Sequence, residues 1–139
     1  MNLLFYPGLD SVDLERGYDE VKGATGKAIK DLCKHHKDIY LKVKFFFRRL
    51  KDVHDLEEYL KVEEILQFHG TDLYEMRIPK QRRGGVFRIY FCFSLEQYKT
   101  EDLILLDAEL KHKTKPMRLE SAKEKLKAYY RTFGKEAQT

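Results

Sequence analysis

The stretch TDLYEMRIPKQRRGGVFRIYFCF, residues 71–93, contains two runs of aromatic and branched apolar side chains joined by a turn. Such runs favour strands, and the Gly84-Gly85 pair favours a turn between them. The sequence between Met76 and Leu95 contains no acidic residue and five basic ones, namely Arg77, Lys80, Arg82, Arg83 and Arg88. Strands that hold cations on a stiff frame beside a glycine turn are suited to binding a polyanion. This hairpin therefore predicts both the sheet and the functional site.

The hairpin is expected to belong to a small twisted antiparallel sheet. Strands are predicted at residues 73–78, 86–94 and 103–110, where apolar, aromatic and branched side chains are separated by turn-like stretches. These three strands would form a meander. Residues 2–6 can add a further short strand, which Pro7-Gly8 would stop.

Helices are predicted mainly before this sheet. Apolar side chains recur at three- and four-residue steps over residues 25–50, which fits one long helix or a helical hairpin broken near residues 36–38. We favour the hairpin, because a helix of ~26 residues is long for a globular protein. Asp10 can cap a short acidic helix over residues 11–22, and a weaker helical pattern covers residues 55–66.

A last helix is expected to begin at Pro116 and to end at Gly134. The predicted fold class is therefore α+β, with N-terminal helices packed on the sheet and a C-terminal helix closing it. A chain of 139 residues is long enough for one domain with a real core. We expect a single domain over residues 1–139, with residues 1–24 as a candidate N-terminal extension.

The charge distribution is more informative than the net charge of +4. Basic side chains are concentrated in residues 26–51, 77–88 and 111–118, a polarised pattern that suits nucleic acid or an acidic protein partner. For residues 26–51, a solvated helix surface explains the pattern equally well. Because no apolar run approaches the length of a membrane span, we expect a cytoplasmic protein.

Four motifs occur in the order typical of one bacterial family. They are LYEMRI (73–78), GGVFRIYFCF (84–93), LILLDAELKHKTKP (103–116) and ESAKEKLKAYY (120–130). Together they resemble the RelE/HigB family of toxins, especially its phage-derived HigB-like branch. The resemblance implies a microbial RNase-like fold, a cognate antitoxin protein as partner and metal-independent cleavage of mRNA on the ribosome. The related ParE branch shares the fold but acts on DNA gyrase, so the fold alone does not decide the function.

Cleavage of this kind needs a base for the 2′-hydroxyl, cations for the pentacovalent phosphate and an acid for the leaving oxygen. Arginine suits the phosphate role, because its planar fork binds two oxygens and its charge is permanent. Arg88 matches the family's strand arginine and is the strongest catalytic candidate, and Arg77 occupies a basic position of the preceding strand. Alternatively, Arg88 is a structural partner of Glu75 or Asp107, and Arg77 of Glu75 or of an acid in residues 96–109.

Further cations are expected to surround these arginines. Lys80, Arg82 and Arg83 in the turn would add salt-sensitive affinity for RNA, unless they form only a solvated turn. The three side chains belong to the turn, where they would steer the protein toward ribosomal RNA. The contribution of the turn would be to binding rather than to chemistry.

The KHKTK segment after the third strand supplies the candidates for proton transfer. His112 titrates near neutral pH, and a crowded cationic site would lower the pKa of Lys113 or Lys111. Lys111 and Lys115 are also expected to bind RNA. This segment is one residue shorter than the usual family form, so which side chain enters the site stays open.

Tyr130 is a candidate for stacking on a base, whereas Tyr129 falls on the apolar stripe of the last helix and is expected in the core. The histidines and the two cysteines lack the spacing of a metal site. Gly84-Gly85 lacks the rest of a nucleotide-binding loop. We therefore expect no metal and no small-molecule cofactor.

The sequence thus predicts the toxin of a type II toxin–antitoxin system, a metal-independent endoribonuclease (an mRNA interferase, hence a hydrolase). Its partners would be a cognate antitoxin and mRNA on the ribosome, with no membrane involved. Two alternatives stay open: a non-catalytic ParE-like inhibitor of a protein target such as DNA gyrase, and a degenerate family member that only binds RNA. A third is a phage accessory protein whose acidic N-terminus covers the site.

Overall fold

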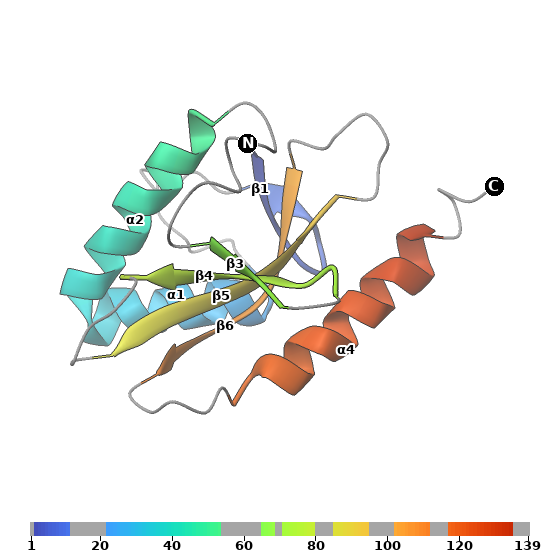
Figure 1. Ribbon diagram of the computed structural model, residues 1–139. Helices are drawn as coiled ribbons and strands as arrows, with labels where there is room; N and C mark the ends of the chain where they lie inside the picture. The colour runs from blue at the N-terminus through green and yellow to red at the C-terminus, as the bar shows by residue number, and fades with distance from the viewer. Residues whose placement is uncertain are drawn as a thin grey trace.

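The computed structural model describes most of the chain, namely residues 2–11, 22–53, 65–68, 71–79, 85–94, 102–111 and 117–134. The described residues form one six-stranded sheet in the order β2-β1-β6-β5-β4-β3, with helices against it (Figure 1). The fold is α+β, as predicted. The sheet is mixed rather than purely antiparallel, because one pair of strands is parallel.

The predicted meander is confirmed. β4 (Tyr74–Ile78), β5 (Val86–Phe93) and β6 (Asp102–Lys111) pair antiparallel in chain order. The register shifts between Tyr90 and Phe91, where β6 has one extra residue. Such a bulge changes which β6 side chains face each side of the sheet. From Val86 to Tyr90, even positions of β5 lie opposite odd positions of β6, and beyond the bulge even positions lie opposite even ones.

β1 (Asn2–Phe5) runs parallel to β6, with Leu3 and Phe5 buried in the core. This short segment is therefore an inner strand of the sheet, and residues 2–5 are part of the domain's core rather than an extension to it. Local sequence showed that residues 2–6 could be extended, but it carried no information about a partner about 100 residues away.

Two strands replace helices that the sequence predicted. β2 (Asp10–Ser11) pairs with β1, so the predicted helix over residues 11–22 is wrong at its start, and residues 12–21 lie outside the described part. β3 (Ile65–Gln67) pairs with β4 at the sheet edge, so the helix over residues 55–66 is wrong at its described end. Its other residues, 55–64, lie outside the description. In both cases pairing with the neighbouring strand in the chain decided the local conformation.

The predicted helical hairpin is confirmed as α1 (Ala24–His35) and α2 (Lys37–Lys51), separated by His36. Both helices place their apolar stripes on one face of the sheet, where Ile29 of α1 and Val43 of α2 are fully buried. The three- and four-residue repeat of the sequence is thus the core-facing side of two amphipathic helices.

The other face carries α4 (Leu119–Tyr129), which continues into one π-helical turn that ends at Gly134. The helix begins at Leu119 rather than at Pro116, which lies outside the described residues. Ala122, Leu126 and Tyr129 pack with strand residues in a second core cluster. No helix of the described residues is long and apolar enough to cross a membrane.

Candidate functional site

Arg77 and Arg88 lie directly opposite each other on β4 and β5. They face the same side of the sheet as α4, because Arg88 is two residues before Tyr90, which packs in the α4 core cluster. Two like charges in this arrangement repel each other unless an opposite charge intervenes. Here that charge is Glu75, whose side chain is almost fully buried.

Glu75 bridges the two arginines. Its Oε1 is bonded by Nε of Arg77, and its Oε2 lies 3.6 Å from Nη1 of Arg88. The alternative pairing of both arginines with Glu75 is therefore present in the structure. The contact with Arg88 is longer than a hydrogen bond, and Nε of Arg88 is buried without a hydrogen-bond partner among the described residues. One carboxylate thus only partly satisfies two guanidinium groups.

Lys111 adds a third cation to this face. It pairs with Val86, two residues before Arg88 on β5, and is buried with 7% of its surface exposed. Within the described part of the chain, its Nζ has no hydrogen-bond partner. Buried cationic nitrogens without acceptors cost free energy, and a bound anion removes that cost. We call Glu75, Arg77, Arg88 and Lys111 the arginine cluster.

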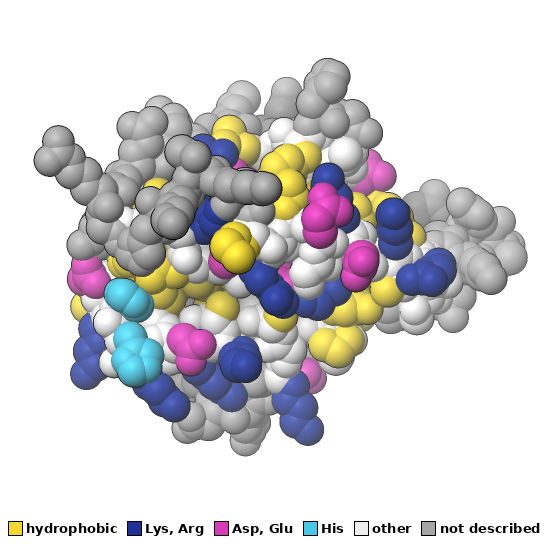
Figure 2. Space-filling model, turned by 90° about the horizontal axis from the view of Figure 1, so that it is seen from below, with side chains coloured by type: hydrophobic (Ala, Val, Ile, Leu, Met, Phe, Trp, Pro, Cys, Tyr) yellow, Lys and Arg dark blue, Asp and Glu magenta, His cyan; other side chains and the backbone are white. Residues whose placement is uncertain are grey.

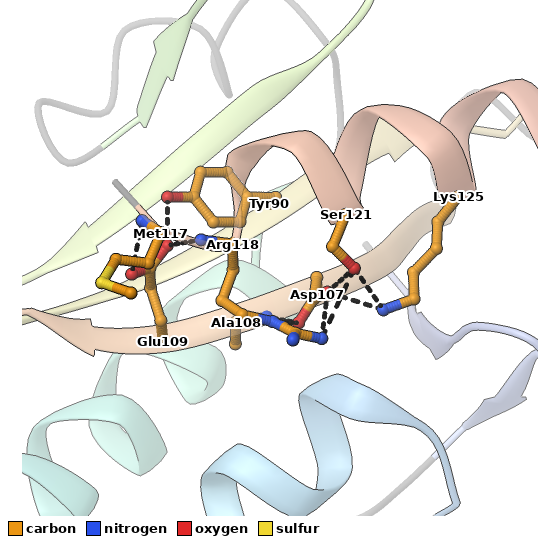
Figure 3. Close-up of polar contacts among 8 residues, drawn as sticks. All are labelled: Tyr90, Asp107, Ala108, Glu109, Met117, Arg118, Ser121 and Lys125. Carbon is orange, nitrogen blue, oxygen red and sulfur yellow. Dashed lines mark hydrogen bonds and ion pairs between the residues drawn. The ribbon is translucent and has the colours of Figure 1, made fainter. Parts of the chain in front are cut away.

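Glu109 lies directly opposite Arg88 but is engaged elsewhere. Its Oε2 accepts hydrogen bonds from the amide of Arg118 at 2.7 Å and from the hydroxyl of Tyr90 at 2.8 Å (Figure 3). Its Oε1 accepts the amide of Met117 at 3.1 Å. Glu109 thus satisfies amides at the start of α4. Burial, and next the bond to Glu109, raise the pKa of Tyr90 above its ordinary value.

Asp107 anchors the same helix through side chains. Its carboxylate accepts hydrogen bonds from Arg118, Ser121 and Lys125 of the helix region, at 2.9, 2.8 and 2.6 Å to Oδ2, and from the amide of Ala108 (Figure 3). Burial acts to raise the pKa of Asp107, but these hydrogen bonds prevail and hold it below its usual value. We call Asp107, Glu109 and their partners the α4 network.

The arginine cluster lies where the end of β4, the start of β5 and the end of β6 lie side by side, to the left of the start of α4 in Figure 1. Three cations against Glu75 and Glu109 leave one net positive charge on this part of the face. The arrangement can bind an anion such as a phosphodiester. Cys92 does not add a nucleophile, because burial raises the pKa of its thiol to about 12.

The structure thus brings together Arg77, Arg88 and Lys111 of the residues predicted from sequence. Tyr130 is not in this group: its hydroxyl lies near Asp72, which precedes β4, whereas Arg77 is near the end of β4. Burial is the main reason that the pKa of Tyr130 is raised. Tyr129 is buried in the core, as predicted. The other predicted site residues lie outside the described ranges, namely Lys80, Arg82, Arg83, His112, Lys113 and Lys115.

Sequence reasoning treated Glu75 only as a competing partner and missed its bridging role. The signal was present, since side chains two residues apart in a strand share a face, as Glu75 and Arg77 do. The α4 network was also missed, because its hydrogen bonds depend on the docking of a distant helix. In the described ranges, no three His, Cys, Asp or Glu side chains gather as a metal site.

Comparisons of this chain with protein-family models, with curated proteins and with solved structures found no match. The function is therefore argued from the chemistry of the arginine cluster and from the sequence motifs.

Proposed function

We propose that the protein is a toxin of the RelE/HigB type that cleaves mRNA on the ribosome without a metal ion. Its partner would be a cognate antitoxin, and its compartment the cytoplasm. The observation that carries the proposal is the cross-strand pair Arg77–Arg88 beside Lys111, with buried cationic nitrogens that no described residue satisfies. The specific activity, cleavage of mRNA on the ribosome, is inferred from the four family-like motifs of the sequence.

The arginine cluster suits the transition state of RNA cleavage. When the 2′-hydroxyl attacks, the phosphate becomes pentacovalent and gains negative charge on its non-bridging oxygens. Arg88 can present two parallel N–H groups to those oxygens, and no described residue accepts a hydrogen bond from its Nε. Because only 13% of its side chain is exposed, its charge acts through a medium less polar than water.

Glu75 is a positioning residue in this account. By pairing with both guanidinium groups, it keeps two like charges on adjacent strands at fixed positions. A preorganised pair of cations loses little entropy when the phosphate arrives. The long contact between Glu75 and Arg88 leaves the latter available to the substrate.

The remaining roles fall to residues on either side of the cluster. His112 and Lys113 follow Lys111 directly at the end of β6, and we assign proton transfer to them. Lys80, Arg82 and Arg83 belong to the connection between β4 and β5, and with Lys115 they would bind the RNA backbone.

One observation favours a second candidate, a non-catalytic inhibitor of a protein target. Both strand arginines have an ion-pair partner in Glu75, which is the arrangement expected if they only stabilise the sheet. In that case the surface of the cluster would bind an acidic protein groove rather than a phosphodiester.

Mapping of mRNA ends in translating cells separates the two candidates. Expression of the wild-type protein is expected to produce codon-associated cuts, and Arg88→Ala is expected to abolish them. Arg131→Ala is a matched control, because Arg131 is an exposed arginine beyond the end of α4. Growth arrest with intact mRNA would support the inhibitor, and cuts that persist in Arg88→Ala would refute the catalytic role of the cluster.

A further inference from the structure

The carboxylate of Glu109 starts from a position opposite Arg88 but is bonded to other groups. The two residues are cross-strand partners on β5 and β6, so their side chains leave the same face of the sheet, where opposite charges normally pair. Among the described residues, however, Arg88 has its ion pair with Glu75, at 3.6 Å, and its Nε has no hydrogen-bond partner there. Glu109 is therefore a second carboxylate that can take the place of a bound anion.

Three donors from the described part of the chain hold the carboxylate of Glu109 where it lies (Figure 3). Its Oε1 accepts the amide of Met117 at 3.1 Å, and its Oε2 accepts the amide of Arg118 at 2.7 Å. The third donor is the hydroxyl of Tyr90, at 2.8 Å from Oε2. Tyr90 is fully buried and lies two residues after Arg88 on β5, so the core fixes this donor beside the arginine cluster.

Acidic and basic side chains are mixed on the surface of this protein. On the face seen in Figure 2, acidic side chains lie among the Lys and Arg side chains. In such a mixture, the affinity of one cation for an anion depends on where the neighbouring carboxylates point, because Coulomb energy falls with distance. Only 13% of the Arg88 side chain is exposed, so water screens its charge incompletely and the position of Glu109 has a large effect.

We propose that Tyr90 is a positioning residue of the arginine cluster: its hydroxyl, with the two amides at the start of α4, keeps the Glu109 carboxylate from pairing with Arg88. Without this bond, the carboxylate turns toward the guanidinium opposite it and competes with a phosphate for the same N–H groups. This role rests on the proposed function only for the identity of the ligand, because the competition applies to any oxyanion. Glu109 thus belongs to the α4 network by its bonds and affects the arginine cluster by its charge.

Binding of a 2′-deoxy dinucleotide, a phosphodiester that cannot be cleaved by 2′-hydroxyl attack, tests the proposal. NMR titration compares wild type, Tyr90→Phe, Glu109→Gln and the double variant. Tyr90→Phe keeps the buried ring and removes only the hydroxyl, and it is expected to weaken binding about threefold. Glu109→Gln removes the competing charge and is expected to strengthen binding about threefold. In the Glu109→Gln background, Tyr90→Phe is expected to have no effect, because no carboxylate is left to be released.

Tyr74→Phe is the matched control. Tyr74 lies on β4 and packs against the core cluster on the face that carries α1 and α2, so its side chain is on the opposite side of the sheet from Glu109. Removal of its hydroxyl is expected to leave the affinity unchanged in both backgrounds. A purely structural role of the Tyr90 hydroxyl predicts instead that Tyr90→Phe has the same effect whether or not position 109 is charged.

The free proteins give a second readout that needs no ligand. Pairing of Glu109 with Arg88 is expected to move the NMR signal of the Arg88 Nε–H group in Tyr90→Phe relative to wild type, and not in the double variant relative to Glu109→Gln. If the dinucleotide fails to bind wild type, the phosphodiester of the proposed function is refuted, while this signal still tests the role of Tyr90. Equal effects of Tyr90→Phe in both backgrounds would overturn the proposal, as would an Arg88 signal that does not move in Tyr90→Phe.

Discussion

Two polar groups share the face of the sheet that carries α4, and they differ in how completely their hydrogen bonds are formed. In the α4 network, the oxygens of Asp107 and Glu109 accept bonds from helix side chains, helix amides and Tyr90. In the arginine cluster, nitrogens of Arg88 and Lys111 are buried and no residue that the structure describes accepts a hydrogen bond from them. A saturated network holds a helix in place, whereas an unsaturated one is ready to bind a ligand.

The difference also separates stability from function. Removing a member of the α4 network should destabilise the fold, because donors that are now satisfied would lose their acceptor. Removing a cation from the arginine cluster should cost activity while changing stability little or even favourably. The predictions below test this division, from the largest expected effect to the smallest.

Arg88→Ala is expected to lower the rate of RNA cleavage by about 100- to 1,000-fold, the usual effect of removing one group that stabilises transition-state charge. Its free energy of unfolding should fall by only about 1 kcal/mol, because Glu75 keeps its bond to Arg77. Cleavage of a reporter mRNA in a purified translation system and urea unfolding measure the two effects. A loss of stability large enough to explain the loss of activity would contradict the assignment of the arginine cluster to function rather than to stability.

Asp107→Ala is expected to lower the free energy of unfolding by about 3 kcal/mol, since it leaves Arg118 and Lys125 without their buried counter-charge. Glu120→Ala is the control: this carboxylate is exposed on the same helix and pairs with Lys123 at the surface, so its loss should cost less than about 0.5 kcal/mol. Urea unfolding followed by circular dichroism compares them. Similar losses in both variants would show that the α4 network is not an anchor.

Lys111→Met is expected to raise the free energy of unfolding by about 1 kcal/mol, because it replaces a buried ammonium that has no hydrogen-bond partner in the described ranges with an apolar chain of similar length. The same variant should cleave RNA more slowly than wild type. The combination of higher stability and lower activity identifies a residue kept for function. A destabilised Lys111→Met protein would indicate that the lysine is structural.

Acidic pH should slightly reduce the contribution of the α4 network to the free energy of unfolding. The pKa of Asp107 in the folded protein is lowered from its ordinary 3.8, so its contribution to stability is complete above that value and is lost as the pH falls through the folded pKa. Wild type should therefore lose stability more steeply than Asp107→Asn below a pH of about 4. Parallel pH profiles of the two proteins would contradict this assignment.

The sequence predicted those parts of the fold that local patterns encode. The meander and the helical hairpin follow from runs and repeats within 10 to 30 residues, and both are present. β1 depends on pairing with a distant strand, and β3 on its pairing with β4, the next strand in the chain. The parallel contact of β1 with β6 spans about 100 residues, and no local pattern specifies it.

The candidate site shows the same limit. The density of basic residues in the hairpin was sufficient to predict Arg77 and Arg88, and strand alternation places both on one face. The burial of Glu75 and Lys111 could not be predicted, because it depends on how the surrounding elements close over them. The position of Tyr130 near Asp72, apart from the arginine cluster, could not be predicted either, since only the path of α4 shows it.

The most direct test of the phosphate-binding role is the NMR signal of the Arg88 Nε–H group, titrated with a 2′-deoxy RNA analogue that cannot be cleaved. We predict that this signal shifts progressively to saturation, and that Lys111→Met weakens the binding while Arg131→Ala leaves it unchanged. A saturating titration in which the Arg88 signal does not move would contradict the account.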